Sequence, residues 1–450
     1  MRLLKFAVRK SLLALGYPKL ETSHPELGVH EVGAIKLRME PNIPACHFFY
    51  PVDPSTKSVT HDGSFVPYFR KEAVEGLLKY LGGFGDGVMQ MLQEKAHPLS
   101  KTYGLPPLEN DDISPQKFPL VLFSHGLGGN MEMYTEICSQ IASTGCVVVA
   151  IEHEDGSASY ARKLLDNGSF ETQLYDYAPP DSEIPYSRQK MVDYKGPKIE
   201  QRVKELRKVY DHFRGDDTKN APESTVSELA RQIVSVSDLD QLHLVGHSFG
   251  GATQLRAAQK WAMEQSKHSP LPTVAMATAA GSRDGSSNSD TVTFSRPDSS
   301  TSLLPVSSPE PLSVTVFDPW NFPLTNEITS KGIPKSSNHR GVQNVLSVMS
   351  ENWVFKNPEH KAALEFLKNI DPAINVSSYY AKNSVHQSVS DTEAFLPSVA
   401  AKKIDNRGPE EQRHETIRAL VREISKLTRA GKESNYEGGN VDDLFVPLPH

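Results

Sequence analysis

The sequence predicts a mixed α/β fold with a mostly parallel central sheet flanked by helices. Two continuous apolar runs, 118–123 and 146–151, enclose a segment whose apolar residues recur with a helical period. A third apolar run, 239–245, leads into a glycine-rich turn and then into small residues that are typical of a helix start. Strands that are apolar on both faces are typical of parallel sheets covered by helices, so these segments indicate βαβ units.

The remaining elements follow from the same two periodicities, taken in chain order. Residues 47–50 resemble a strand that ends at Pro51, and residues 71–92 resemble a helix interrupted by glycines. Residues 156–197 are polar and resemble an excursion over the surface. Helical spacing predicts helices over 198–213, 248–263 and 414–430. Further strands are expected at 312–317 and, from weaker patterns, at 353–355 and 376–379.

Composition excludes several classes of protein. The formal net charge is −7 and no basic stripe is visible, which argues against a nucleic-acid-binding protein. The three cysteines are too few for a disulfide framework, and Cys138 and Cys146 stand in apolar surroundings typical of buried residues. No zinc-binding spacing such as CxxC or HExxH occurs, so we expect neither a metal site nor a cofactor. The sequence does not define an oligomeric state.

We expect one large domain with a disordered insertion. Residues 1–29 form an N-terminal extension whose basic start indicates an amphipathic or targeting helix, residues 30–430 the domain, and residues 431–450 a C-terminal tail. Residues 281–310 contain ten serines and too little apolar surface to offset chain entropy, which is typical of a disordered insertion. No apolar stretch has the form of a secretory signal or the length of a membrane span, so we expect a cytoplasmic protein, with membrane association left open.

The turn after the third apolar run contains the strongest chemical motif. It reads Gly246-His247-Ser248-Phe249-Gly250, a G-x-S-x-G pattern between a strand and a helix. Glycines on both sides of the serine allow a sharp turn that exposes the hydroxyl at the helix N-terminus. This nucleophile elbow is typical of the α/β-hydrolase fold, and it predicts Ser248 as a catalytic nucleophile. The alternative is a structural glycine turn with an incidental serine.

A serine nucleophile requires a histidine base and a carboxylate that orients it, and in this fold they follow the serine in the order acid, then base. Asp318 follows the expected strand 312–317 directly, which places it at the edge of the sheet where such sites form. His386 lies shortly after the strand expected at 376–379, and it is our candidate for the base. The rival acids and bases are Asp284, Asp290, Asp298 and Asp371, and His339, His360, His414 and His450. His360 and His414 stand on charged helical stretches typical of solvated surface.

Ester hydrolysis also needs two backbone N–H groups that stabilise the oxyanion of the tetrahedral intermediate. The residue after the nucleophile, Phe249, is the first candidate. The second is Leu127, in the glycine-rich turn that follows the strand 118–123. The alternative for that turn is a simple chain reversal.

Together these residues resemble the platelet-activating-factor acetylhydrolase family, which belongs to the phospholipase A2-like lipid esterases. The shared segments are 123–128, 152–158, 246–253, 317–324 and 384–387, and the resemblance extends from about residue 30 to 397. It implies a triad of Ser248, Asp318 and His386, with Leu127 and Phe249 as oxyanion donors. It also implies calcium-independent hydrolysis of short or oxidised sn-2 acyl groups of phospholipids, with a phospholipid as substrate.

The resemblance and the residues leave three functions open. The first is a phospholipid acetylhydrolase, the second a carboxylesterase or lipase for other acyl esters, and the third a non-catalytic hydrolase fold that binds lipid or protein. An enzyme of the first kind docks on a lipid surface, and the apolar residues of 71–92 favour that stretch as the docking surface. The alternative for that stretch is packing on the core.

Overall fold

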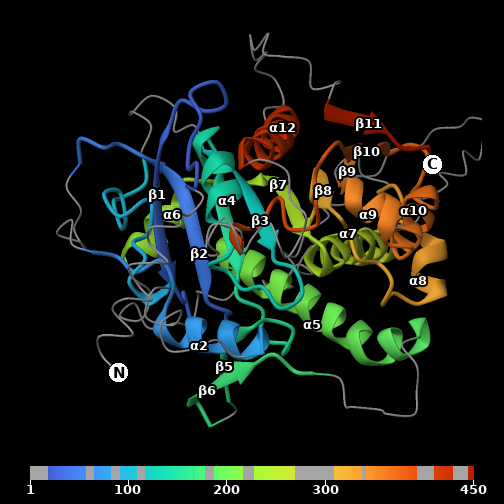
Figure 1. The fold of residues 1–450 in the computed structure, drawn as a ribbon, viewed down its shortest axis with the longest axis horizontal. Helices are drawn as coiled ribbons and strands as arrows, with labels where there is room; N and C mark the ends of the chain where they lie inside the picture. The colour runs from blue at the N-terminus through green and yellow to red at the C-terminus, as the bar shows by residue number, and fades with distance from the viewer. Residues whose placement is uncertain are drawn as a thin grey trace, which may run out of the picture.

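The computed structural model places most of the chain in one α/β structure (Figure 1). It describes residues 19–56, 65–82, 92–108, 117–165, 167–177, 187–215, 228–268, 309–336, 341–392, 410–428 and 444–449. The first 18 residues and nearly all of the expected insertion 281–310 lie outside the described residues. The predictions of a targeting helix and of a disordered insertion therefore stay predictions.

The core of the fold is a nine-stranded sheet in the order β1-β2-β4-β3-β7-β8-β9-β10-β11. In chain order its strands are β1 Glu31–Leu37, β2 Cys46–Val52, β3 Phe118–Ser124, β4 Val147–Ile151, β7 Ser237–His247, β8 Ser313–Phe317, β9 Asn344–Ser350, β10 Asn375–Ala381 and β11 Phe445–Pro447. The six central strands from β4 to β10 pair in parallel, and the strands at both edges pair antiparallel. This is the mostly parallel sheet that the apolar runs predict.

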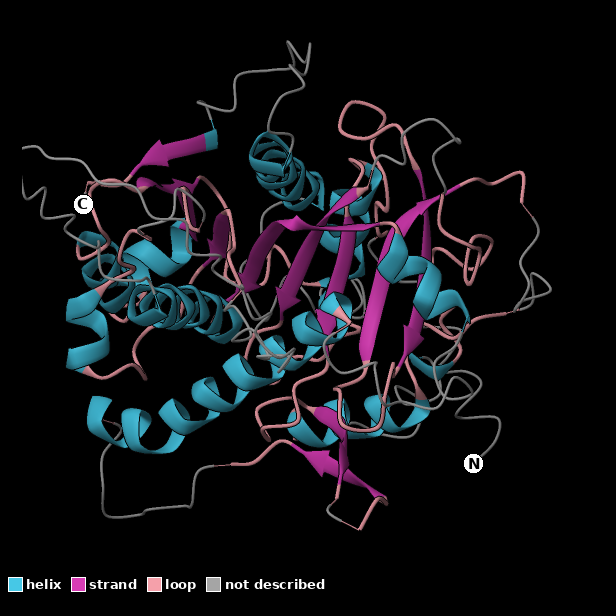
Figure 2. Ribbon diagram, turned by 180° about the vertical axis from the view of Figure 1, so that it is seen from behind, coloured by secondary structure: helices cyan, strands magenta, loops and turns pink. Residues whose placement is uncertain are grey.

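Helices cover both faces of the sheet, as Figures 1 and 2 show. They are α2 Lys71–Tyr80, α4 Thr135–Ser143, α5 Arg188–Arg214, α6 Glu228–Ser235, α7 Phe249–His268, α8 Asn326–Lys331, α9 Glu351–Lys356, α10 His360–Lys368 and α12 Glu410–Thr428. A separate hairpin of β5 Tyr160–Leu164 and β6 Phe170–Leu174 lies beside the sheet. Successive strand residues alternate between two buried cores: Leu122 packs with α5, α6, α7 and α10, whereas Val121 and Phe123 pack with α2, α4 and α12.

One expectation about local structure is wrong, and one strand was not predicted. Residues 353–355, expected as a weak strand, belong to helix α9, because the Ser350 side chain accepts a hydrogen bond from the Trp353 amide and caps the helix. The segment 344–350, just before α9, forms strand β9, which we did not predict from the sequence. Within 156–197, the expected surface excursion, the chain forms the β5–β6 hairpin and the first turns of α5, a helix that continues through Pro197.

Both ends of the expected domain extend further than predicted. Strand β11, from the expected tail 431–450, pairs with β10 at the edge of the main sheet. In the expected N-terminal extension, Leu27 is buried in the core and Glu21 forms an ion pair with Arg418 of α12. The described residues of these two segments, 19–29 and 444–449, therefore pack as parts of the domain. All three cysteines are free and buried, which confirms the prediction for Cys138 and Cys146.

Within the described part of the stretch 71–92, several apolar side chains lie in the core. Leu77, Leu78 and Leu92 are each 4% exposed and pack in the core, so the core alternative holds for them. Val88 and Met89 lie outside the described residues, and Leu81 at the end of α2 is exposed. Among the described residues, no helix is both long and apolar enough to cross a membrane.

Candidate active site

Ser248 stands on the turn between β7 and α7, in the conformation that the glycine pattern predicts. Its φ is 57°, a left-handed value that is rare for residues other than glycine. A Cβ on Gly246 would lie 2.5 Å from the Gly250 oxygen, and one on Gly250 would lie 2.0 Å from the Ser124 oxygen. The turn thus has no room for side chains at either glycine, and the Ser248 amide is fixed by a 2.8 Å hydrogen bond to the Phe317 carbonyl.

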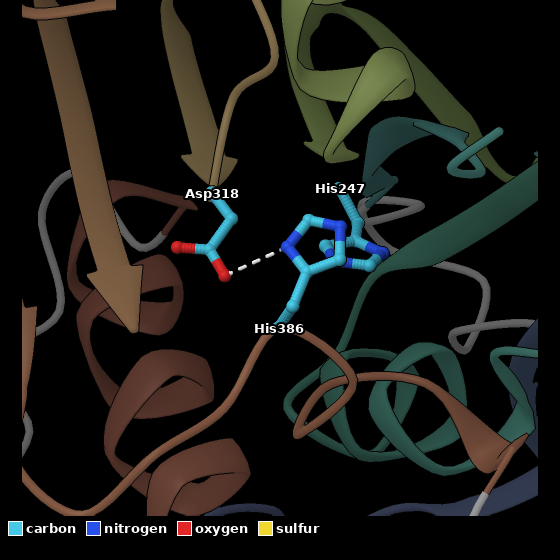
Figure 3. Close-up of side chains that lie close together, drawn as sticks. All are labelled: His247, Asp318 and His386. Carbon is cyan, nitrogen blue, oxygen red and sulfur yellow. Dashed lines mark hydrogen bonds and ion pairs between the residues drawn. The ribbon is translucent and has the colours of Figure 1, made fainter. Parts of the chain in front are cut away.

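The structure brings Ser248, His386 and Asp318 into one hydrogen-bonded chain. His386 Nε2 lies 3.0 Å from Ser248 Oγ. His386 Nδ1 lies 3.0 Å from Asp318 Oδ2, the contact that Figure 3 shows. A carboxylate only accepts, so the Nδ1 hydrogen points to Asp318 and Nε2 is free to take the serine proton. Asp318 and Ser248 are buried, while the His386 side chain is 28% exposed.

Asp318 is itself held in place by β9, a contact that sequence reasoning missed. Its φ is 45°, so the chain turns sharply after β8 and aims the carboxylate at His386. Ser350, the last residue of β9, donates to Asp318 twice, from its amide to Oδ1 at 2.5 Å and from its hydroxyl to Oδ2 at 2.7 Å. The position of Ser350, between a mostly apolar segment and a helix, was the one local feature that could have indicated this role.

Aromatic rings hold the imidazole of His386 on two sides. Trp353 of α9 stacks on it with ring centroids 4.5 Å apart and an interplanar angle of 17°, and His247 lies 4.6 Å away. Burial, together with the nearby His386, holds the pKa of His247 well below its ordinary value. His247 is therefore neutral at physiological pH and adds no charge beside the base. Its Nδ1 contacts the Tyr134 hydroxyl at 2.9 Å.

Asp391 anchors the loop that bears His386. Its amide donates to the Met133 carbonyl, and its carboxylate accepts from the Thr135 and Glu136 amides at the start of α4 and from the Tyr68 hydroxyl. Burial raises the pKa of Asp391 to about 6, although Arg413 opposes the shift. Asp391 thus ties the loop to the N-terminus of α4; the amides there favour its ionised form, but burial outweighs them.

The two candidate oxyanion donors come from two different turns, Phe249 from the start of α7 and Leu127 from the turn after β3. Phe249 is the first residue of α7, so its amide has no acceptor within the helix. In the turn after β3, the amides of Gly126, Gly128 and Gly129 all donate hydrogen bonds. Among the described residues, the Leu127 amide has no acceptor. Both amides are therefore free to bind a substrate oxygen.

The other candidate histidines that the structure describes, His360 and His414, contact groups outside the Ser248 site. His360 begins α10, far along the chain from the elbow, and its Nδ1 contacts the Asn357 carbonyl. His414 is only 8% exposed and contacts Glu136 at 2.6 Å, so the expectation of a solvated surface histidine is wrong for it. Its contact crosses from α12 to α4, which local sequence does not reveal. His339 and His450 lie outside the described residues.

Two clusters in the described residues have metal-ligand spacing, His247–Asp318–His386 and Glu21–Glu136–His414. In the first, both nitrogens of His386 already contact Ser248 and Asp318. In the second, Glu136 is paired with the guanidinium of Arg413. The negative charge of each cluster is thus satisfied by protein groups.

The fold and this arrangement define an α/β-hydrolase with a serine, histidine and aspartate site. In a comparison with solved structures, a ferulic acid esterase from Streptomyces cinnamoneus matches 96% of this chain and 100% of its own, with a TM-score of 0.52 at 15% identity. That likeness shows the fold.

The family follows from sequence. The family model "Platelet-activating factor acetylhydrolase, isoform II" matches residues 19–267, more than half of the chain, and the protein belongs to this family. A platelet-activating factor acetylhydrolase from Canis lupus familiaris is 34% identical over 218 residues, 45% of each chain. A putative phospholipase A2 from Schizosaccharomyces pombe is 34% identical over 134 residues, 29% of this chain and 26% of its own. The alignments thus span less than half the length of these relatives.

Proposed function

We propose that this protein is a calcium-independent serine esterase that hydrolyses short or oxidised sn-2 acyl groups of phospholipids, as a 1-alkyl-2-acetylglycerophosphocholine esterase does. The observation on which the proposal depends is the chain from Ser248 Oγ through His386 to Asp318, with 3.0 Å at each contact. Family membership supports the substrate class.

The geometry gives each residue a step. His386 Nε2 takes the Ser248 proton as Oγ attacks the ester carbonyl, and the amides of Leu127 and Phe249 hold the resulting oxyanion. His386 then protonates the leaving lysophospholipid alcohol, which leaves an acyl-serine. Water, deprotonated by His386, attacks the acyl-enzyme and releases the carboxylic acid with Ser248 restored. Asp318 keeps the imidazole in the right tautomer and stabilises its positive charge.

The test is hydrolysis of a series of phospholipids that differ only in sn-2 chain length, with EDTA in excess. We expect kcat/KM to be highest for acetyl or oxidised short chains and to be unaffected by EDTA. Equal or higher rates on long chains, or on esters that are not phospholipids, would favour a general lipase or carboxylesterase. A protein that hydrolyses none of them and resists a fluorophosphonate would be a non-catalytic binding module.

Contact with a lipid surface is part of the proposal. The exposed side chains of Leu81 and Tyr177 support it, because they lie near the oxyanion turn. The Tyr177 hydroxyl donates to the Tyr80 carbonyl, and the Tyr80 ring packs directly against Gly128 of that turn. We expect a Leu81→Ser, Tyr177→Ser variant to bind liposomes more weakly and to hydrolyse a soluble ester normally. Cell fractionation tests the expected cytoplasmic location.

A further inference from the structure

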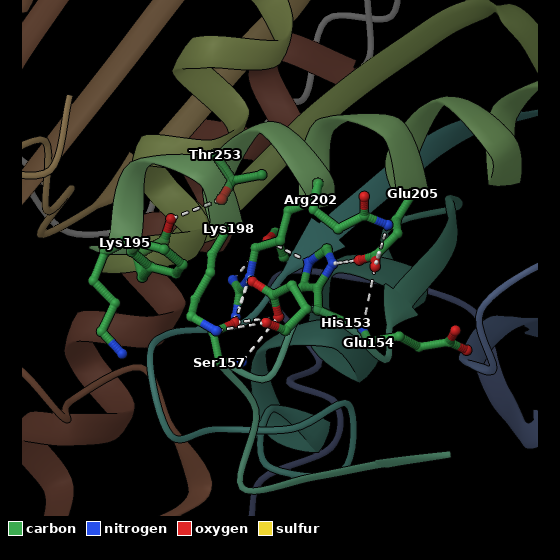
Figure 4. A network of polar contacts seen from close by, with 12 residues as sticks. His153, Glu154, Ser157, Lys195, Lys198, Arg202, Glu205 and Thr253 are labelled. Atoms are coloured by element: carbon green, nitrogen blue, oxygen red, sulfur yellow. Dashed lines mark hydrogen bonds and ion pairs between the residues drawn. The ribbon is translucent and has the colours of Figure 1, made fainter. Parts of the chain in front are cut away.

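A second hydrogen-bonded chain of serine, histidine and carboxylate starts at Ser124, the last residue of β3; Figure 4 shows its histidine, His153, and its carboxylate, Glu205. Ser124 Oγ contacts His153 Nε2 at 2.8 Å, and His153 Nδ1 contacts Glu205 Oε2 at 2.8 Å. Neither Ser124 nor His153 has any exposed surface, so this chain does not meet a substrate. It converges instead on the guanidinium of Arg202, which lies 3.5 Å from Ser124 Oγ.

We propose that Arg202 is a positioning residue that fixes the two halves of the oxyanion hole relative to each other; the inference rests on the proposed function. On the turn side, Arg202 Nη1 donates to the His125 carbonyl at 2.6 Å. Its Nη2 and Nε donate to Ser157 Oγ at 2.7 and 2.9 Å, and the Ser157 carbonyl accepts the Gly128 amide at 2.8 Å. Arg202 thus fixes the backbone on both sides of Leu127.

The same guanidinium also contacts the other half of the hole. Its central carbon lies 4.7 Å from the centroid of the Phe249 ring, a cation–π contact with the residue whose amide is the second donor. Phe249 is fully buried, so its ring cannot move away from Arg202 without opening the core. One side chain therefore contacts Phe249 itself and, through the His125 carbonyl and Ser157, the backbone that flanks Leu127.

The groups around Arg202 allow its charged guanidinium to be buried. Arg202 has no exposed surface, and Asp155 lies 3.2 Å from its Nε, which offsets the cost of desolvation. Burial, together with Arg202, holds the pKa of His153 well below its ordinary value, so the ring is neutral. A planar group with five fixed donors suits several acceptors at once, which a lysine ammonium cannot match.

The test is Arg202→Lys, with Arg207→Lys as the matched control. Arg207 lies on the same helix and pairs with Asp211 and Glu264 at the surface. The readouts are kcat, KM and the inhibition constant of a trifluoromethyl ketone, which forms a tetrahedral adduct with Ser248 and places an oxyanion in the hole. For Arg202→Lys we expect kcat to fall about 10- to 100-fold and the inhibition constant to rise by the same factor, with KM little changed. We expect Arg207→Lys to match the wild type.

A purely structural role would lower the melting temperature and the active fraction without moving the inhibition constant, and that result overturns the inference. Wild-type kcat and inhibition constant in Arg202→Lys overturn it as well. If Arg202→Lys does not fold, Ser157→Ala serves in its place, because it removes two contacts of the guanidinium; it should shift the inhibition constant in the same direction, and no shift overturns the inference. If the wild type hydrolyses no ester, the proposed function fails, and the inference with it.

Discussion

Within the described residues lie two hydrogen-bonded chains of serine, histidine and carboxylate, and of these two only one has the features of an active site. Contact distances do not separate them: they are 3.0 and 3.0 Å along Ser248, His386 and Asp318, and 2.8 and 2.8 Å along Ser124, His153 and Glu205. Exposure does separate them, because the His386 side chain is 28% exposed and that of His153 is 0% exposed.

The backbone separates them too. Ser248 lies on a left-handed turn at a helix start, beside two free amides, whereas Ser124 ends a strand in extended conformation and its hydroxyl faces the buried Arg202. A hydrogen-bonded triad is therefore no proof of a nucleophile. Access and oxyanion donors are also required, because the rate enhancement comes from stabilising charge that develops on the substrate.

The largest expected effect is that of Ser248→Ala. We expect kcat to fall by a factor of about 10⁴ or more, since only the attacking oxygen is lost. Ser124→Ala should still be labelled by a fluorophosphonate at Ser248, with stability lower by about 1–3 kcal/mol because His153 Nε2 is left buried without its partner. Peptide mass spectrometry of the labelled protein identifies the serine. Labelling of Ser124 in place of Ser248 would reverse the assignment.

Removing the charge of Asp318 and removing that of Glu205 should change kcat by very different factors. Asp318→Asn is expected to lower kcat by about 10⁴, because the amide favours the wrong tautomer of His386. Glu205→Gln should lower it by about tenfold at most, the scale of one neutral hydrogen bond, since His153 takes up no proton in the reaction. Steady-state kinetics on one soluble ester compares them. Losses of equal size would mean that both chains take part in proton transfer.

The loop that bears His386 is held in place by the buried carboxyl group of Asp391, whose charge depends on pH. Its folded pKa of about 6 lies above the unfolded value near 3.9, so the folded state retains this proton longer as the pH rises. The stability contribution is therefore full below about pH 4 and is lost as the pH rises through 6, by about 3 kcal/mol. Denaturant unfolding from pH 4 to 7 measures it.

Asp391→Asn is the control for that pH dependence, because the amide keeps an acceptor for the start of α4 and does not titrate. We expect the stability difference between wild type and Asp391→Asn to change by about 3 kcal/mol, with the wild type relatively more stable at low pH. A difference that is constant across this range would show that Asp391 titrates normally.

The smallest effect is expected from Ser350→Ala. It removes a hydrogen bond to Asp318 and the cap of α9, so kcat should fall about tenfold and stability by about 1 kcal/mol. Thr325→Ala is the matched control, since Thr325 caps α8 in the same way by accepting from the Ile328 amide. It should lose similar stability and keep its kcat. Equal kcat in both variants would exclude a role of Ser350 in orienting Asp318.

The local features of the fold could be predicted from the sequence. The strand patterns predicted β3, β4 and β8 to within one residue at each end and β7 to within two, and the glycine spacing around Ser248 predicted a sharp turn. The order of acid and base after the elbow, the expected strands before them and the family resemblance together favoured Asp318 and His386. Each of these signals depends on neighbouring residues or on chain order, and side-chain period and turn chemistry are local properties of a chain.

Only the tertiary structure decided which distant side chains meet. Ser350 reaches Asp318 across 32 positions, Arg202 reaches the turn at His125 across 77, and His414 reaches Glu136 across 278. Nothing in the neighbourhood of Arg202 marks its partner, and His414 even has the surroundings of a surface residue. Their pairing depends on how helices pack on the two faces of the sheet, where a buried polar group must find a partner and close packing determines which one lies within reach.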